Sequence, residues 1–274
     1  MIRLITLLTI LFSISTNLYS SIKITYSGEE LPDKVASKID LMISTMYDFY
    51  SKVGVLEESE VELIVFKNIK DGYRYMRTIY PDNPNYKHFH GEKPIGSYVG
   101  GVYVGHLSKA VILGMENGIE NALKTIYHEL SHHFTQEVFK YKKFQPVWLN
   151  EGLAEFFEGM QVKGKNIKGS QVPLHQKGQI KTMIMLDEFD VYKILSLPQI
   201  EFKQRLQKDG GLYYSISHVL VAVIIEQIGL DGFAKMVNAI ANRNLSDNIA
   251  DIVSQNYKGG LKDLENDIIK FVQK

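Results

Sequence analysis

The spacing of apolar residues changes near residue 116, and this change limits the folds that the chain can adopt. Up to that point, short runs rich in Val, Ile, Tyr and Phe alternate with helical stretches. After it, apolar residues recur every three or four positions almost without interruption, a period typical of packed helices. We therefore predict an α+β protein, with a small N-terminal sheet lobe that also contains helices and a mostly helical C-terminal lobe.

The N-terminal lobe, residues 21–115, is predicted to hold the strands. Four short runs have the composition of strands, at 22–26, 61–67, 97–104 and 110–113, and the last two predict a hairpin. Helical periods predict helices at 31–52 and 69–79, and a long loop rich in Pro, Asn, His and Gly follows at 82–96.

The C-terminal lobe, residues 116–274, is predicted to consist of helices separated by Gly and Asn. Their expected ranges are 118–140, 147–160, 191–208, 212–228, 231–242, 246–256 and 260–273.

Residues 1–20 differ from the rest of the chain. They carry a single charge, Arg3, followed by an apolar run from Leu4 to Phe12 and then by small and polar residues. This order is typical of a secretory signal peptide, and the run is too short to span a bilayer. An uncleaved N-terminal anchor is the alternative. We expect an exported protein, periplasmic or secreted from a bacterial cell, with no stable membrane insertion after the signal is cleaved.

Composition excludes several classes of function. Lys and Arg together number 31, as do Asp and Glu, and no basic run occurs along the chain, so nucleic-acid binding is not expected. The chain has no cysteine, which excludes disulfide scaffolds, iron–sulfur ligation and thiol catalysis. Any metal must therefore be held by His, Asp or Glu.

The first helix of the C-terminal lobe has a start signal and a buried face. Asn117 followed by Glu120 predicts a capping box that opens it. The apolar residues of this helix recur at spacings of three and four and are Ile119, Leu123, Ile126, Leu130, Phe134 and Val138.

The same helix carries the sequence His-Glu-Leu-Ser-His at residues 128–132. Residues four apart lie one above the other on a helix, so His128 and His132 can converge on one ion at about 2.0–2.1 Å each. Zinc is the metal most consistent with these ligands. Glu129 is turned about 100° around the helix from His128, a direction suited to taking a proton from metal-bound water.

A second helix supplies a third candidate ligand. Eighteen residues separate His132 from Glu151, which lets the chain turn and return a carboxylate to the same ion. Two His and one Glu leave the fourth position open to water, as a catalytic zinc site requires. Gly152 inside this helix costs about 1 kcal/mol relative to Ala and predicts a close helix crossing over the metal.

The arrangement resembles the gluzincin zinc metallopeptidases of the peptidase MA clan, which include thermolysin-like proteases and aminopeptidase N-like enzymes. The match is strong over about 30 residues, from Tyr127 to Phe157. The run Asn-Glu-Gly-Leu-Ala at residues 150–154 looks most like the aminopeptidase type. For residues 21–274 the resemblance implies a zincin-like fold with the active-site cleft between the two lobes.

The resemblance also implies roles for particular residues. His128, His132 and Glu151 would bind zinc, and Glu129 would be the general base. Glu155, one helical turn beyond Glu151, resembles the carboxylate that accepts a hydrogen bond from a ligand imidazole. A solvated helix charge is the alternative for Glu155.

Hydrolysis of a carbonyl compound by water also needs a hydrogen-bond donor for the oxyanion that develops on the carbonyl oxygen. We expect a tyrosine to be this donor. Aminopeptidase-like gluzincins use a tyrosine some 60 residues after the Glu ligand, and Tyr213 and Tyr214 lie 62 and 63 residues after Glu151. We favour Tyr214, with packing as the alternative for either residue.

The run Gly-Met-Glu-Asn at residues 114–117 looks like the motif by which aminopeptidases hold a substrate's free amine. Only ten residues separate it from His128, which is closer than in that family. We therefore interpret Asn117 as a helix cap and Glu116 as a helix-start charge.

The hairpin at 97–113 could instead supply an edge strand for an extended peptide. Glycines 100 and 101 would permit a close approach, and a bulge or turn explains them equally well.

The remaining histidines are expected to have other roles. His133 should point away from the ion and pack. His88 and His90 lie in the predicted loop, where a second metal site is not favoured. His218 follows Tyr214 by one helical turn and could assist in the cleft, although we assign it no role.

We predict an exported zinc metallopeptidase that hydrolyses peptide bonds of a peptide or protein substrate without a covalent acyl-enzyme. A degenerate zincin that acts as a non-catalytic envelope binding or assembly module is the main alternative. Zinc-dependent hydrolysis of a non-peptide bond is a third possibility.

Overall fold

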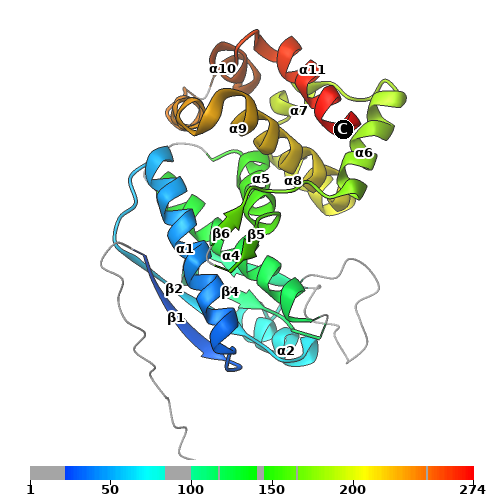
Figure 1. Ribbon diagram of the computed structural model, residues 1–274. Helices are drawn as coiled ribbons and strands as arrows, with labels where there is room; N and C mark the ends of the chain where they lie inside the picture. The colour runs from blue at the N-terminus through cyan, green and yellow to red at the C-terminus, as the bar shows by residue number, and fades with distance from the viewer. Residues whose placement is uncertain (1–21, 84–99, 117, 141–144, 165, 245) are drawn as a thin grey trace, which may run out of the picture.

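The computed structural model describes residues 22–83, 100–116, 118–140, 145–164, 166–244 and 246–274. Within them, a four-stranded sheet lies in the N-terminal part and helices make up most of the C-terminal part (Figure 1). The predicted α+β class is confirmed. The predicted signal peptide and most of the predicted loop at 82–96 lie outside the described residues.

The sheet is built on a parallel βαβ unit. Strands β1 (Ile22–Gly28) and β2 (Ser59–Val65) pair in parallel and are joined by helix α1 (Asp33–Val53). Helix α2 (Ile69–Ile79) follows β2. The predicted strands and helices of this region are confirmed, and the bounds of α2 agree with the predicted range.

The second half of the sheet is a hairpin. Strand β4 (Lys109–Ile112) pairs in parallel with β2, and β3 (Gly101–Val104) pairs antiparallel with β4. A single 3₁₀ turn (Gly105–Leu107) joins β3 to β4. The strand order is β1-β2-β4-β3, so β3 lies at one edge. The predicted hairpin is confirmed over its described residues.

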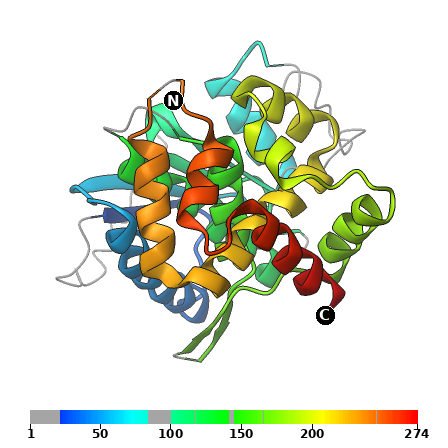
Figure 2. The same cartoon turned by 90° about the horizontal axis from the view of Figure 1, so that it is seen from above.

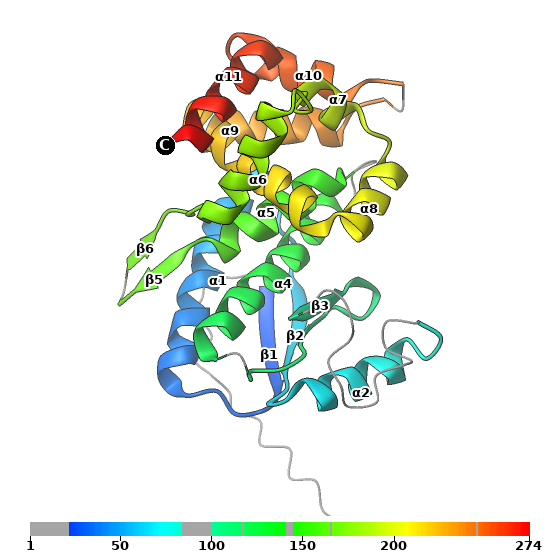
Figure 3. The same cartoon turned by 90° about the vertical axis from the view of Figure 1, so that its right-hand side faces the viewer.

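Alternation along the strands divides their side chains between two apolar clusters. Leu63 and Val65 of β2 and Ile112 of β4 belong to the main core, which α1 and α4 share. Ile64 and Val111 point to the opposite face, where they pack with residues of α2. Helices therefore cover both faces of the sheet, as Figure 1 and Figure 3 show.

The C-terminal part contains eight helices and a small hairpin in the described residues. The helices are α4 (Ile119–Phe139), α5 (Val147–Glu158), α6 (Leu174–Met185), α7 (Val191–Ser196), α8 (Gln199–Lys208), α9 (Gly210–Ala241), α10 (Ile249–Asn256) and α11 (Gly260–Gln273). The hairpin consists of β5 (Gln161–Lys163) and β6 (Asn166–Lys168). It projects from the rest of the molecule in Figure 2 and Figure 3.

Two helix breaks depend on single residues. The range 191–208, predicted as one helix, is two helices, because Pro198 restricts Leu197 to extended backbone (φ −57°, ψ 133°). The predicted break near residue 229 is confirmed, since Gly229 has a φ of 69° inside α9.

The hairpin β5–β6 and helix α6 are not among the predicted elements. Of its residues, α6 buries only Gln176 and Ile180, so it has no apolar stripe that a sequence pattern could reveal. The strands of the hairpin are three residues each, too short to establish an alternation.

Packing brings α4, α5 and α9 together around the candidate site. Helix α5 packs against both α4 and α9, and α4 packs against α1 and the β3–β4 hairpin. A Cβ atom on Gly152 of α5 would overlap the carbonyl oxygen of Ser217 and come within 2.7 Å of Val221, both on α9. The close helix crossing predicted from Gly152 is therefore present, with α9 as the partner.

One buried cluster extends through both predicted lobes, from β1 and α1 to α11. The boundary predicted near residue 116 thus does not separate two cores. Within the described residues, the segment Gly211–Ala241 of α9 is long and apolar enough to cross a membrane by length and composition. Its side chains supply much of this cluster, including Leu220, Val221 and Val223, so it serves as a core helix in this fold.

Candidate metal centre

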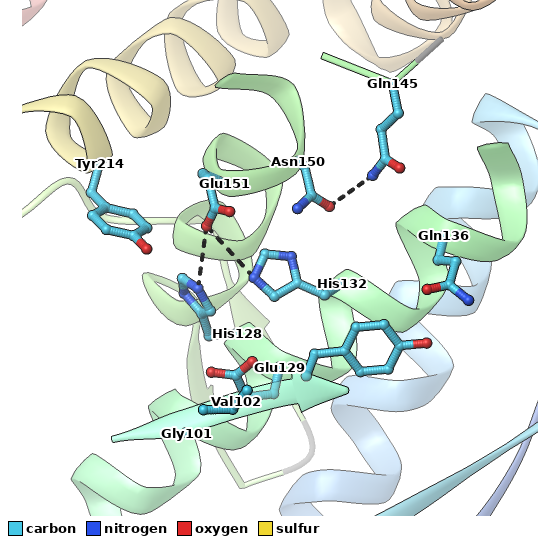
Figure 4. Close-up of a pocket in the computed structure, with 11 residues that line it drawn as sticks. Gly101, Val102, His128, Glu129, His132, Gln136, Gln145, Asn150, Glu151 and Tyr214 are labelled. Atoms are coloured by element: carbon cyan, nitrogen blue, oxygen red, sulfur yellow. Dashed lines mark hydrogen bonds and ion pairs between the residues drawn. The ribbon is translucent and has the colours of Figure 1, made fainter. Parts of the chain in front are cut away.

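Two imidazoles and one carboxylate converge between α4 and α5. Oε2 of Glu151 lies 3.8 Å from Nε2 of His128 and 3.6 Å from Nε2 of His132. The two imidazole rings are 4.9 Å apart between centroids. In Figure 4 both Nε2 atoms point towards Glu151. The three ligands predicted from spacing are thus brought together by the fold.

The geometry and chemistry of these atoms fit zinc. Two imidazole nitrogens and a carboxylate oxygen are the ligand set of one class of catalytic zinc sites. Ligand atoms about 2.1 Å from a tetrahedral ion lie about 3.4 Å apart, close to the distances measured here. The three side chains are 12%, 13% and 16% exposed, and all three line one cavity.

The start of α4 differs from the predicted capping box. The N-cap position is Gly118, with a φ of 93° and no side-chain cap, and Asn117 lies outside the described residues. Glu120 forms an ion pair of 2.6 Å with Lys38. Glu116, predicted as a charge at this helix start, accepts a 3.0 Å hydrogen bond from a backbone N–H at the start of α2.

A carboxylate orients His128, and it is not the one predicted. Nδ1 of His128 lies 3.0 Å from Oε2 of Glu158 and 3.8 Å from Oε1 of Glu155. Glu155 instead accepts a 2.7 Å hydrogen bond from Nε2 of Gln176. The role predicted for Glu155 therefore falls to Glu158, the last residue of α5.

These carboxylates determine the charge of His128. Burial alone would lower the pKa of His128, but the hydrogen bond to Glu158 and the charges of Glu129 and Glu155 raise it to about 10. The hydrogen bond to His128 in turn lowers the pKa of Glu158 although burial opposes it. Without an ion, the pair is therefore an imidazolium and a carboxylate at neutral pH.

His132 has a different environment. Burial is the largest influence and lowers the pKa of His132. No group among the described residues meets its buried Nδ1 atom with full hydrogen-bond geometry, although Asn150 is close enough to oppose the lowering of the pKa. Asn150 lies beside this ring in Figure 4, and its Oδ1 atom accepts a 2.9 Å hydrogen bond from Nε2 of Gln145. A neutral imidazole is ready to bind an ion at Nε2.

Glu129 is buried beside the candidate ligands and contacts the edge strand. Burial raises the pKa of Glu129 to about 7, although the charge of His128 and a hydrogen bond from the backbone N–H of Tyr103 oppose the shift. A carboxylate with a pKa near neutrality both accepts and returns protons efficiently at physiological pH.

Gly101 allows β3 to approach Glu129. A Cβ atom at this position would lie 2.8 Å from Cγ and 2.9 Å from Oε1 of Glu129, and 2.6 Å from Cγ2 of Thr125. Any larger residue would therefore displace the Glu129 side chain or the strand. The close approach seen here is to helix α4; the approach of a substrate peptide to glycines 100 and 101 stays a prediction.

The structure distinguishes the two neighbouring tyrosines. Tyr214 lines the cavity, with its ring centroid 6.2 Å from that of His128. Tyr213 is buried against Phe202, and its hydroxyl accepts a 2.7 Å hydrogen bond from Arg205. Burial and the carboxylates, of which Glu151 is the most influential, raise the pKa of Tyr214, so its hydroxyl keeps its proton and is able to donate a hydrogen bond.

Two other histidines near the site have structural partners. His133 is buried, and its two nitrogens lie 2.9 Å from the Tyr103 hydroxyl and 3.2 Å from Ser59 Oγ. His218 is buried and contacts Gln176 and Ser170 at 2.8 and 3.0 Å. Burial lowers the pKa of each histidine to about 4, so both are neutral. The other two candidates, His88 and His90, lie outside the described residues.

The converging groups line a cavity of about 330 Å³. Its walls come from β3, α4, α5 and α9, with Gly101 and Val102 on one side and Tyr214 on another (Figure 4). Sequence reasoning did not identify Glu158, Gln136 or Gln145 as site residues. The i+7 spacing of Glu158 from Glu151 and the i+4 spacing of Gln136 from His132 are the signals that point to these two residues. Gln145 precedes α5 and has no such signal.

Comparisons with protein-family models, with curated proteins and with solved structures found no match.

Proposed function

We propose that this chain is a zinc-dependent metallopeptidase of the gluzincin type, with a zincin-like fold and its active site in the cavity between α4, α5, α9 and β3. The observation that carries the proposal is the convergence of His128, His132 and Glu151, with distances of 3.6 and 3.8 Å to the carboxylate. A buried carboxylate that is not a ligand, Glu129, lines the same cavity.

Each residue has a distinct role in this proposal. Zinc, when bound, would act as a Lewis acid and supply a water molecule of lowered pKa. Glu129 takes the proton of the attacking water on its carboxylate and returns it to the leaving amine. The protonated hydroxyl of Tyr214 donates a hydrogen bond to the oxyanion.

The edge strand favours an extended peptide as substrate. Among the described residues, β3 pairs with β4 alone, and its residues line the cavity. An extended peptide can add to such an edge through main-chain hydrogen bonds. This feature favours peptide bonds over other hydrolysable bonds.

The alternative is a degenerate zincin that binds a partner in the cell envelope without catalysis. A purely structural zinc site is closed by four protein ligands, whereas three ligands converge here beside an open cavity. Burying the Glu129 carboxylate is also unfavourable, and a purely structural metal site would gain nothing from it. Both observations favour the enzyme.

We further propose that the protein is exported and works in a bacterial periplasm or outside the cell. The support is the order of charge, apolar run and polar residues in 1–20.

Metal analysis combined with an unbiased peptide library tests the proposal. The zinc-loaded chain is expected to cleave peptides, and a chelator should abolish cleavage. Glu129→Gln should retain one zinc per chain while losing nearly all turnover. Zinc binding without cleavage of any peptide, or equal turnover in Glu129→Gln, would favour the non-catalytic alternative or another base.

A further inference from the structure

The row of cleft-facing residues on α4 continues beyond the proposed zinc ligands. His128, His132 and Gln136 follow at intervals of four and all line the cavity, because residues four apart share a helix face. Four residues of helix rise about 6 Å, so Gln136 lies about that far along the axis from His132. Gln145, which precedes α5, lies above Gln136 on the same side in Figure 4.

Three amide side chains form this end of the cavity, which we call the amide end: Gln136, Gln145 and Asn150. Nε2 of Gln145 donates to Oδ1 of Asn150 at 2.9 Å, and Nε2 of Gln136 donates a long hydrogen bond of 3.4 Å to the carbonyl of Gly105. Among the described residues, the hydrogen bonds of both glutamines use Nε2, which leaves Oε1 as an acceptor. Each Nε2 also has a second hydrogen to donate.

Among the described residues, the side chains of the amide end carry no charge. In the described part of the chain, the only carboxylates that line the cavity are Glu129 and Glu151, both at the proposed metal centre, and no Lys or Arg lines it. None of the described residues that line the amide end would supply a counter-ion to a charged substrate side chain. An aliphatic one would cover amide groups without satisfying them, which is unfavourable.

We propose that the amide end binds a neutral polar side chain of the substrate, that of Asn, Gln, Ser or Thr. This inference rests on the proposed peptidase function and adds a specificity to it. An extended peptide rises about 3.3 Å per residue, so a distance of about 6 Å places the recognised side chain within two residues of the scissile bond. Gln136 and Gln145 are then specificity-determining residues.

Two measurements on the zinc-loaded full chain test this. The first is cleavage of a peptide library by the parent protein and by the double variant Gln136→Met/Gln145→Met, since Met keeps the side-chain length and removes the amide. The second is capture of uncleaved library peptides by Glu129→Gln, with and without the two Met substitutions. Capture does not require turnover, so it reports on the amide end even if no peptide is cleaved.

A matched control uses an amide pair outside the cavity. Nε2 of Gln161 donates to Oε1 of Gln171 at 2.9 Å in an exposed position on the β5–β6 hairpin. Gln161→Met therefore removes a comparable amide without touching the cleft, and it should leave the selectivity unchanged.

Selectivity for Asn, Gln, Ser or Thr over Leu of about tenfold or more is expected at one position within two residues of the cleaved bond. The double variant should lose it or prefer Leu, in cleavage and in capture. If the captured peptides show this selectivity but the parent protein cleaves no peptide, the binding specificity is supported and the proposed peptidase function is contradicted. Aliphatic or charged preference in the captured peptides, or selectivity unchanged in the double variant, would overturn the inference.

Discussion

Nδ1 of His128 lies 0.8 Å closer to the nearest oxygen of Glu158 than to that of Glu155, at 3.0 Å against 3.8 Å. Both carboxylates lie on α5, three residues apart. The shorter contact is a hydrogen bond that fixes the tautomer and orientation of a proposed zinc ligand, whereas Glu155 is held by Gln176. This relationship assigns different roles to two similar residues.

The first prediction is that Glu158→Gln weakens zinc binding more than Glu155→Gln does. Loss of the group that orients a ligand imidazole commonly reduces metal affinity 10- to 100-fold. We expect about tenfold or more for Glu158→Gln and less than threefold for Glu155→Gln. Competition with a chromogenic chelator measures both values. A larger loss for Glu155→Gln would show that the imidazole turns to Glu155 when the ion binds.

Zinc binding should release a proton from His128 at pH 7. The pKa of His128 is raised to about 10 without an ion, so the imidazolium must lose its proton before Nε2 can act as a ligand. Lowering the pH favours the protonated form of His128 and should therefore weaken zinc binding. Calorimetry in two buffers with different ionisation enthalpies counts the protons.

The same measurement on Glu158→Gln provides a control. The hydrogen bond and charge of Glu158 contribute to the raised pKa, so fewer protons should be released from this variant at pH 7. No dependence of the enthalpy on buffer in the parent protein would contradict a protonated His128.

Gly101→Ala should reduce turnover while leaving zinc bound. The new Cβ would lie 2.8 Å from Cγ of Glu129, so the proposed base must move away from its position between the proposed ligands and β3. A displacement of about 1 Å can cost about 100-fold in rate, and we expect at least a tenfold fall in kcat. Gly178→Ala on α6 is the control, because no atom lies within 4 Å of its added Cβ. If Gly101→Ala turns over substrate at the parent rate, strand β3 moves to accommodate the new Cβ and Glu129 keeps its position.

The two tyrosines should differ on loss of their hydroxyls. Tyr214→Phe removes the proposed donor to the oxyanion and should lower kcat about 100-fold or more with little change in KM. Tyr213→Phe removes a hydrogen bond from Arg205 and should affect stability by about 1 kcal/mol without a large change in kcat. Steady-state kinetics and urea unfolding separate these effects. The opposite pattern would assign the catalytic role to Tyr213.

Helix periodicity was sufficient to predict much of the candidate centre. His128 and His132 share a face because they are four residues apart on one helix, and this relationship does not depend on the rest of the fold. Predicting Glu151 as a third ligand required only one further assumption, that the helix after α4 packs back against it. The strands were predictable because β2 and β4 divide their apolar residues between two covered faces.

The choice of Glu158 over Glu155 could not be predicted in the same way. Both residues follow Glu151 on α5, at i+7 and i+4, and either faces α4 if the crossing angle allows it. Which carboxylate reaches Nδ1 of His128 depends on how α5 packs between α4 and α9. Gly101 presents a similar case, since its contact with Glu129 exists only once β3 has docked on α4.

Tyr213, Tyr214 and helix α6 illustrate two further limits on what the sequence alone can predict. Neighbours on a helix point about 100° apart, so only the rotation of α9 decides that Tyr214, and not Tyr213, enters the cavity. Helix α6 buries too few apolar residues to produce a periodic pattern. Its position depends on contacts with α9 and α11, which are distant in the sequence.

X-ray absorption at the zinc edge tests the central claim most directly. The full chain, loaded with one equivalent of zinc, is predicted to show two imidazole ligands at about 2.0–2.1 Å and oxygen ligands at about 2.0–2.2 Å. His132→Ala should remove one imidazole from that shell. A chain that binds no zinc at one equivalent, or a shell without imidazole, would contradict the assignment of His128, His132 and Glu151 as a metal centre.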